Sequence, residues 1–372
     1  MWQLPTRTLS AGAAVAAALL FGGAFNSALS ETVKIAGNMP LTGPMASFSG
    51  NYFKAFQMGL DDACKVNKVD CSQFKLDAQD NAGEATQAVT VMQKQLLDDP
   101  TVVISGVSAQ SQAVLPIVDK LGIPHFVESF DPFIVPEGKS NRLRTLPNYK
   151  VQAPLYFRIV DKLKPKRVFA LTLNWASLNT EFSVLIEPEM KKRNIAFAKE
   201  PFNIDAKEFD NLVLKAKAFN PDFYIIDGFS FLMYPIMKAM AKYGIDPTKV
   251  MLDLDFIDLL YSDTPIDELK GYYFASPLYE VPGATTGAES LRARFKDQYK
   301  QALSYVPAYA YDTAGIIVAA QTKFGKVTKE TLIKSTPYTG VTGDVKLDEN
   351  GDLVDTVTVA QITKNGKIVE VK

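Results

Sequence analysis

The 372-residue sequence contains a single histidine, His125, and this scarcity removes most familiar catalytic arrangements. A Ser-His-Asp triad would have to use His125, and no serine stands in the GxSxG pattern of a nucleophile elbow, because Gly106–Gln110 lacks the final glycine. Metal sites built on HExxH or on several histidines are excluded outright. His125 itself lies between Pro124 and Phe126, so we predict a packed, hydrogen-bonded core side chain.

Phosphate-binding loops are missing as well. No GxGxxG follows a predicted strand, and Gly138–Ser140 lacks the earlier glycine of a P-loop because Phe133 stands there. The carboxylates of Asp253 and Asp255 are compatible with acid–base work, but two residues apart on a strand they share a face, and one could simply cap a helix. We therefore predict that the protein is not an enzyme and needs no cofactor or metal.

Only two cysteines occur, Cys64 and Cys71. In an oxidising compartment such a pair is more often bridged than free. The alternative is a redox-active pair, but the CxxC spacing that lowers a thiol pKa is absent. We predict a structural disulfide at the end of a helix.

Long apolar runs are absent except at the start of the chain. Ala11–Ala24 is uncharged, follows the single positive charge of Arg7, and precedes the small residues of Ala28–Ser30. This order is that of a secretory signal, and the run is shorter than the ~20 residues that cross a bilayer. We predict a signal peptide at residues 1–30, cleaved before Glu31, and a mature chain free in the periplasm, since no nearby cysteine would carry a lipid.

Neither sign of charge is in excess. The chain has 40 basic and 41 acidic residues, and loss of Arg7 leaves 39 against 41, a net charge of −2. A nucleic-acid partner is therefore disfavoured. The ~340 residues that remain after the signal suggest two compact units.

Short β-rich apolar runs alternate with longer stretches of helical period, which is typical of parallel sheets with crossover helices. The pattern predicts strands at Val33–Ala36, Phe74–Ala78, Val102–Ser105 and His125–Val127, with helices near Gly50–Val66, Glu84–Leu97 and Ser111–Leu121. It restarts with strands at Arg167–Leu171, Ala196–Glu200, Phe223–Asp227 and Val250–Leu254, and helices near Glu181–Arg193, Phe209–Phe219 and Tyr234–Tyr243. The predicted fold class is α/β.

The last part of the chain breaks this alternation. Val345–Leu347 and Val357–Ile362 flank an acidic turn, Asp348–Asp352, whose Asn-Gly step favours a tight hairpin. We predict that the two strands form an antiparallel hairpin. The alternative for the turn, a calcium loop, is disfavoured because its glycine stands at the wrong distance from the first aspartate for an EF-hand.

Several segments together resemble the type I periplasmic binding proteins of branched-chain amino acid transport, the family of the Leu/Ile/Val-binding protein. They are Ile35–Pro44, Asp80–Ala88, Val103–Gly106, Gly122–Pro124, Arg144–Pro147 and Gly340–Gly343. Each stretch alone is weak evidence, but their order and spacing extend over nearly the whole chain after residue 30.

The resemblance implies two lobes, each a mainly parallel sheet flanked by helices, joined by a hinge of three crossing segments. The first lobe would contain residues 31–146 plus about 279–335, and the second 147–278 plus about 336–372. Ligand would close the cleft between the lobes, since open α/β sheets bind ligands at the carboxyl ends of their strands.

The resemblance also implies ligand contacts from both lobes. The first-lobe candidates are Phe48, Gln110, Ser111, Glu128, Ser129 and Phe130. The second-lobe candidates are Trp175, Ser177, Phe229 and either Asp253 or Asp255. In the family's amino-acid binders, hydroxyls and N–H groups of the first lobe hold the carboxylate and an acidic residue neutralises the ammonium, because burying either charge alone is costly.

Three positions depart from the family pattern. Gln110 stands where a hydroxyl is common, Phe130 where a threonine is common, and Ser177 where a tyrosine is common. The aromatic side chains of these loops favour an aromatic or other bulky carboxylate over an aliphatic amino acid, unless they belong to the core. These aromatic residues are Phe48, Phe130, Trp175 and Phe229.

We therefore expect a monomeric substrate-binding component of an ABC uptake transporter. It would capture an amino acid, keto acid or aromatic acid and deliver it to the permease subunits. A ligand-sensing module of the same fold, which reports to a receptor, is the first alternative. An exported α/β enzyme is the second.

Overall fold

The computed structural model describes residues 32–43 and 46–372, so the predicted signal peptide, residues 1–30, lies outside the described residues. The first of the two large sheets is parallel and has five strands in the order β2-β1-β3-β4-β5. Its strands are β1 (Val33–Met39), β2 (Phe74–Asp80), β3 (Val102–Gly106), β4 (His125–Glu128) and β5 (Arg142–Leu143). The strands β1, β3 and β4 are buried on both faces, as parallel strands covered by helices require, whereas the edge strand β2 is largely exposed or half-buried.

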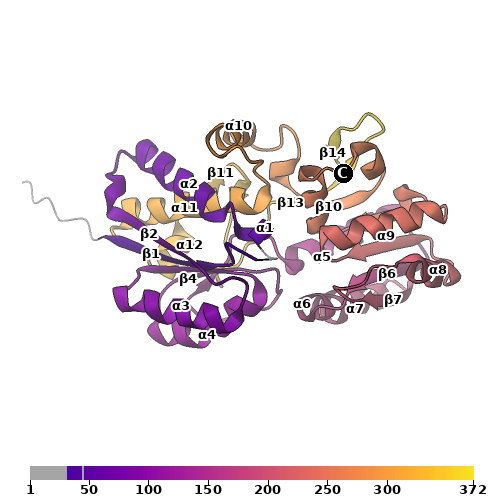
Figure 1. The fold of residues 1–372 in the computed structure, drawn as a ribbon, viewed down its shortest axis with the longest axis horizontal. Coiled ribbons are helices and arrows are strands. Elements are labelled where there is room, and N and C mark those ends of the chain that lie inside the picture. Colours follow the sequence, from indigo (N-terminus) through magenta and orange to yellow (C-terminus); the bar gives the residue numbers. More distant parts are fainter. Residues whose placement is uncertain (1–31, 44–45) are drawn as a thin grey trace, which may run out of the picture. The chain divides into compact units, whose positions relative to one another are not determined.

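Helices cover both faces of the first sheet (Figure 1). The helices α2 and α11 pack together on one face, and α3 and α4 on the other. Gly59 permits the close approach of α2, because a Cβ there would collide with the backbone of Tyr311 on α11. The helices are α1 (Ala46–Ser49), α2 (Tyr52–Asn67), α3 (Ala85–Gln95), α4 (Ser108–Leu121), α10 (Ala288–Tyr299), α11 (Tyr305–Phe324) and α12 (Lys329–Lys334).

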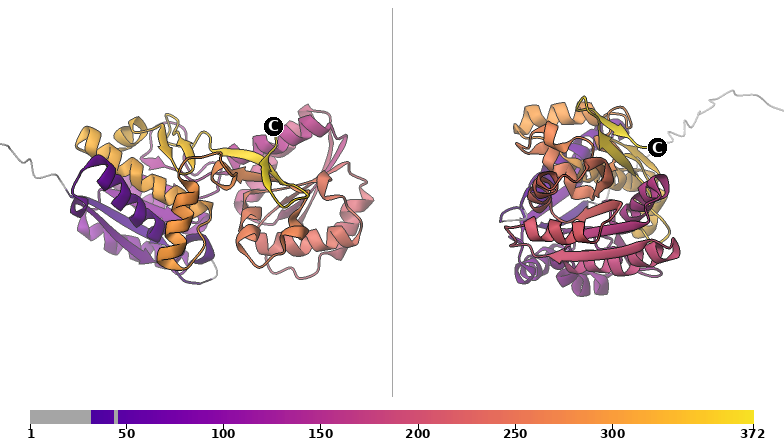
Figure 2. Two further views of the ribbon diagram at one scale, coloured as in Figure 1. Left: turned by 90° about the horizontal axis from the view of Figure 1, so that it is seen from above. Right: turned by 90° about the vertical axis from the view of Figure 1, so that its right-hand side faces the viewer.

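The second sheet has the order β14-β13-β10-β9-β8-β6-β7, and its helices lie on both faces (Figure 2). The five strands β6, β7, β8, β9 and β10 run parallel to one another, whereas β13 is antiparallel to its neighbours β10 and β14. The strands are β6 (Arg167–Leu173), β7 (Ala196–Phe202), β8 (Phe223–Asp227), β9 (Val250–Leu252), β10 (Tyr273–Pro277), β13 (Val357–Ile362) and β14 (Ile368–Glu370). The helices are α5 (Tyr149–Leu163), α6 (Ala176–Thr180), α7 (Glu187–Lys192), α8 (Asp210–Ala218) and α9 (Ser230–Lys242).

The predicted α/β class is confirmed, but the predicted hairpin near the end of the chain is wrong. The Asn-Gly turn closes only an isolated bridge between Leu347 and Leu353. The strand β12 (Gly343–Val345) pairs with β11 (Tyr338–Gly340), while β13 joins the second sheet. The apolar strand β13 is buried along almost its whole length between β10 and β14, and this burial outweighs the local preference of the turn.

Smaller predictions have mixed outcomes. The predicted disulfide between Cys64 and Cys71 is present, and it ties the last turn of α2 to the segment that follows the helix. The region predicted as one helix, Glu181–Arg193, begins earlier with α6 and contains a π-helical segment, Glu181–Ile186. The strand predicted as Val250–Leu254 ends at Leu252, because Asp253 starts the 3-10 helix η5 (Leu254–Tyr261).

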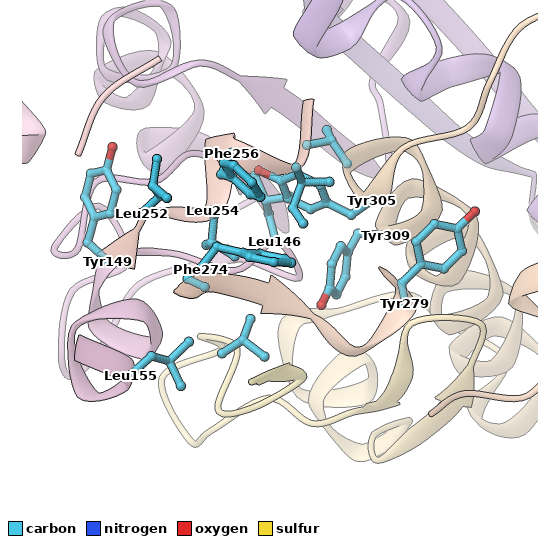
Figure 3. Close-up of a cluster of buried hydrophobic side chains, with 14 of the residues drawn as sticks. Leu146, Tyr149, Leu155, Leu252, Leu254, Phe256, Phe274, Tyr279, Tyr305 and Tyr309 are labelled. Atoms are coloured by element: carbon cyan, nitrogen blue, oxygen red, sulfur yellow. The ribbon is translucent and has the colours of Figure 1, made fainter. Parts of the chain in front are cut away.

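One continuous hydrophobic core includes side chains from both sheets. Figure 3 shows Tyr305 and Tyr309 of α11 beside Phe256 and Phe274, which belong to η5 and β10. The rings of Phe256 and Phe274 lie 4.7 Å apart between centroids. The helix α11 is buried around almost its whole circumference, which is typical of a helix with no solvent-facing side.

The chain passes between the two sheets along three segments, which agrees with a three-segment hinge; the lobe limits stay a prediction. These segments follow β5, β10 and β12. A buried ion pair joins the first segment to the third. The Nε and Nη2 groups of Arg144 donate to the two carboxylate oxygens of Asp352, each at 2.8 Å, and both side chains are buried.

The substitution Asp352→Ala should remove the carboxylate that pairs with the buried Arg144 and so lower the free energy of unfolding. Removing one partner of a buried ion pair costs about 3–5 kcal/mol of folding free energy, whereas an exposed pair contributes about 1 kcal/mol at most. Denaturant unfolding measures both. The control is Asp119→Ala, which breaks the partly exposed pair with Arg142. Equal losses in the two variants would contradict the central role of the Arg144–Asp352 pair.

Candidate functional site

The loops after β3 and β4 meet at the carboxyl edge of the first sheet, because the two strands are parallel neighbours. The Oγ atoms of Ser108 and Ser129 lie 2.7 Å apart, and Ser129 Oγ also accepts a hydrogen bond from the N–H of Asp131 at 3.1 Å. Ser108 begins α4, so the unpaired N–H groups of that first turn lie in the same place. Hydroxyls and N–H groups of this kind can bind a carboxylate.

Val107, directly before α4, has a strained backbone. Its φ angle is 67° and its ψ angle 132°, a combination that a β-branched residue rarely adopts. Its N–H donates to the carbonyl oxygen of Glu128 at 3.1 Å, which holds this conformation in place. Backbone strain of this type is found most often at binding and catalytic sites.

Two of the predicted first-lobe residues point into the protein. Ser111 is fully buried, and its hydroxyl lies 2.9 Å from that of Ser105, which in turn contacts Nε2 of His125 at 2.8 Å. His125 is thus the hydrogen-bonded core residue that the sequence predicted, and burial lowers its pKa to about 3. Gln110 donates to the carbonyl oxygen of Gly83, while its own buried Oε1 has no partner among the described residues.

Glu128 is bound by protein groups on both carboxylate oxygens. Oε1 accepts from the Thr145 hydroxyl at 2.8 Å, and Oε2 from the N–H of Leu146 at 2.9 Å. Burial raises the pKa of Glu128 to about 7, although these two hydrogen bonds oppose the rise. The geometry makes Glu128 a support for the segment that leaves the first sheet. Its contact with a ligand stays a prediction.

Two other first-lobe candidates lie near the same edge. Phe130 is half-buried, and its ring stacks on Tyr149 of α5 with centroids 5.8 Å apart. Phe48 lies in α1, which follows the end of β1. Tyr149 was not predicted as a site residue, although it stands only two residues after Pro147, the last residue of a segment that carries the family resemblance.

At the carboxyl edge of the second sheet, two aromatic side chains pair. Trp175 precedes α6, and Phe229 precedes α9; their rings meet edge to face with centroids 5.6 Å apart. Both are half-buried, and the more exposed Phe231 stacks on Phe229 at 5.7 Å. Ser177 is buried in the first turn of α6. The structure therefore brings the predicted Trp175, Ser177 and Phe229 to one edge.

Asp253 and Asp255 differ in their surroundings. Asp253 is buried, and its two carboxylate oxygens accept hydrogen bonds from the N–H groups of Gly228, at 2.8 Å, and Asp255, at 2.9 Å. Asp255 remains partly accessible. Burial raises the pKa of both carboxyls, and the neighbouring carboxylates raise them further.

Sequence reasoning missed a buried polar group behind these aspartates. Asp227 at the end of β8 accepts from the Tyr156 hydroxyl at 2.5 Å, and Gln152 of α5 contacts both Asp227 and Glu181. Asp227 carried a usable signal, because it ends a predicted strand. Glu181 and Gln152 did not, since one lay inside a predicted helix and the other in a region without a predicted element.

The second edge carries acidic side chains that have no basic partner in the part of the chain that the structure describes. Within residues 32–43 and 46–372, no Lys, Arg or His forms an ion pair with Glu181, Asp227, Asp253 or Asp255. The same described part of the chain holds no group of three or more side chains placed to bind a metal ion. None of its helices is both long and apolar enough to cross a bilayer.

Comparisons with known proteins agree over nearly the full length. A family model described as "Periplasmic binding protein" matches residues 32–367. The chain is similar to the leucine-, isoleucine-, valine-, threonine- and alanine-binding protein of Pseudomonas aeruginosa, with 23% identity over 96% of this chain and 97% of that protein.

Two solved structures show the shared two-lobed fold. One is a branched-chain amino acid transporter substrate-binding protein from Streptococcus pneumoniae in complex with isoleucine. It has a TM-score of 0.75 and 18% identity, covering 92% of this chain and 100% of that one. The other is a solute-binding protein of an ABC transporter from Rhodopseudomonas palustris in complex with 3,4-dihydroxybenzoic acid. It has a TM-score of 0.76 and 18% identity, covering 91% and 95%.

Val107→Gly should relieve the strain at the start of α4. Glycine adopts positive φ angles without steric cost, so the free energy of unfolding should hold or rise by up to about 1 kcal/mol. Val354→Gly is the control, because Val354 has an ordinary φ angle in a loop. There the added chain entropy should cost about 0.5–1 kcal/mol. Equal losses in both variants, measured by denaturant unfolding, would argue against strain at Val107.

Proposed function

The chain belongs to the periplasmic binding protein family, as its sequence resemblance predicted, and from this premise we propose that it is the substrate-binding component of an ABC uptake transporter. Its ligand is an amino acid or a related small carboxylate, aromatic ones included. The ligand binds between the carboxyl edges of the two sheets, and closure delivers it to permease subunits. Residues 1–30 direct the chain to the periplasm and are removed there.

The observation that carries this proposal is the opposite chemistry of the two edges. The first sheet offers the hydroxyls of Ser108 and Ser129 beside the first turn of a long helix, whose N–H groups favour an anion. The second sheet offers Asp253 and Asp255 without any ion pair in the described residues. A zwitterion with a carboxylate and an ammonium group matches both edges, and each charge would gain the partner that burial requires.

Aromatic contacts support a bulky side chain on that ligand. The edge-to-face pair of Trp175 and Phe229 lies at the second edge, and the stacked pair of Phe130 and Tyr149 joins the first edge to α5. Aromatic faces of this kind bury large apolar areas with little loss of conformational entropy. The relative from Rhodopseudomonas palustris, solved with a dihydroxybenzoic acid, shows that the fold can accept an aromatic ring.

The proposal includes no enzymatic activity, and the burial of His125 supports this choice. The sole histidine is fully buried, burial lowers its pKa so that the ring is neutral, and its Nε2 atom is hydrogen-bonded to the hydroxyl of Ser105 in the core. A general base must reach the proton that it abstracts, which a side chain sealed inside the first sheet does not. The remaining polar groups at the two edges can bind and orient a ligand.

Thermal-shift screening of residues 31–372 against amino acids, keto acids and aromatic acids should identify the ligand class. A ligand at 100 times its dissociation constant stabilises the folded state by about 2.7 kcal/mol. We expect aromatic or bulky amino acids to raise the melting temperature more than their keto-acid analogues, which lack the ammonium group. No shift with any carboxylate, amine or amide would refute the proposal.

Trp175 also supplies a direct test, because it is the sole tryptophan after residue 30. Its fluorescence should change on titration with the ligand from the screen. Trp175→Ala should weaken binding by about tenfold, the equivalent of about 1.4 kcal/mol, measured by calorimetry. Phe324→Ala removes an exposed ring at the carboxyl end of α11 and should leave affinity unchanged. Undiminished binding by the Trp175 variant would remove this residue from the site.

A further inference from the structure

Gln152 of α5 holds together the polar groups behind the second edge. Its Oε1 accepts the N–H of Leu254 at 3.0 Å, so the amide group is fixed in orientation. Its Nε2 lies 3.2 Å from Oε1 of Glu181 and 3.3 Å from Oδ2 of Asp227. Both carboxyl groups therefore lie within reach of one nitrogen atom, and all three side chains are fully buried.

Hydrogen atoms are too few for the acceptors present. Gln152 Nε2 carries two hydrogens but has three acceptors, since the Tyr156 hydroxyl is also within 3.0 Å. The Tyr156 hydroxyl donates its only hydrogen to Asp227 Oδ2, at an oxygen–oxygen distance of 2.5 Å. Oε2 of Glu181 and Oδ1 of Asp227 are left without a donor among the described residues, although both atoms are buried.

The surrounding groups do not supply positive charge. The hydroxyls of Tyr149 and Tyr156 come from α5, and the carboxyls of Asp253 and Asp255 come from the segment after β9. Asp253 accepts hydrogen bonds from two backbone N–H groups, and its carboxyl group also lies next to that of Asp227, where it adds negative charge. Two neighbouring carboxylates without a cation cannot both remain ionised at low dielectric.

We propose that Glu181 and Asp227 share one proton, in a carboxyl–carboxylate hydrogen bond that ties the π-helical segment Glu181–Ile186 to the end of β8. This bond makes the second edge sensitive to pH whether or not a ligand is bound. The shared proton lies between two groups that each carry a buried oxygen without a donor among the described residues, Glu181 Oε2 and Asp227 Oδ1. Loss of the proton leaves two adjacent charges directly behind Gly228 and Asp253.

Burial raises the pKa of Glu181 and of Asp227, and the charge of Asp227 raises that of Glu181 further. A carboxyl whose pKa is higher in the folded than in the unfolded state binds more protons when folded. Its stabilising contribution is complete below the unfolded value of about 4 and is lost as pH rises through the folded value. The shared proton therefore predicts falling stability toward alkaline pH.

Glu181→Gln tests this, because the amide can donate to Asp227 permanently. Denaturant unfolding in weak buffer with a pH indicator at about pH 7 should release one proton fewer from this variant than from the parent. Its unfolding constant should also rise less steeply with pH, by up to a factor of ten per pH unit. Glu187→Gln, on the neighbouring α7 and paired with Lys199 at the surface, should behave like the parent.

An equal proton release from parent and Glu181→Gln would overturn the proposal. Asp227→Asn provides a second reading with the same expected loss of one proton. Should neither variant fold, infrared spectra of the folded parent, recorded from neutral to alkaline pH, must still show a carboxylic acid band that disappears as the pH rises; its absence would overturn the proposal. None of these measurements uses a ligand, so failure of the proposed transport function would leave the result intact.

Discussion

The buried guanidinium of Arg144 is the interaction on which the rest of the structure depends. Besides its two bonds to Asp352, Nη1 donates to the carbonyl oxygens of Ser129, at 2.7 Å, and Asp131, at 2.5 Å. Its backbone N–H binds the carbonyl of Gly351 at 2.9 Å. One side chain thus joins the loop after β4 to the first and last segments that run between the sheets. A buried charge with all three nitrogen atoms hydrogen-bonded tolerates little displacement, so the loop bearing Ser129 is held by the segments that run between the sheets.

The two edges of the candidate site are built on opposite principles. At the first edge, Glu128 and Ser111 find protein partners for their polar atoms, and strain at Val107 is held by the bond to the Glu128 carbonyl. At the second edge, carboxyl groups outnumber donors. Satisfied polar networks are rigid, whereas incompletely satisfied ones respond to a ligand or a proton. Under the proposed function, the hydroxyls of Ser108 and Ser129 would offer fixed partners to an anion, and the carboxyl groups of the second edge would gain a partner when a cationic group arrives.

The sequence predicted the parts that depend on local pattern. Strands such as Val102–Ser105 and Phe223–Asp227 were recognised because buried parallel strands are short apolar runs. The destination of β13 could not be read in this way, since the Asn-Gly turn is a local signal and the pairing of β13 with β10 is not. The resemblance located the loops of the candidate site, but not which side chains turn inward. Ser111 forms a hydrogen bond with Ser105 inside the core, whereas Ser108, three residues earlier in α4, forms one with Ser129 at the sheet edge. Sequence spacing alone does not separate these two environments.

Gln152 illustrates why the supporting residues of a site are harder to predict than its loops. An uncharged amide within a helix has no sequence signature, yet here it contacts Glu181, Asp227 and the backbone of Leu254. It therefore couples α5, the π-helical segment, β8 and η5 through one side chain. Because α5 begins where the chain leaves the Arg144 segment, a shift of that segment would displace Gln152 and alter the bonds of both carboxyls. Through Gln152, α5 thus joins the segment that bears Arg144 to the carboxyl groups behind the second edge.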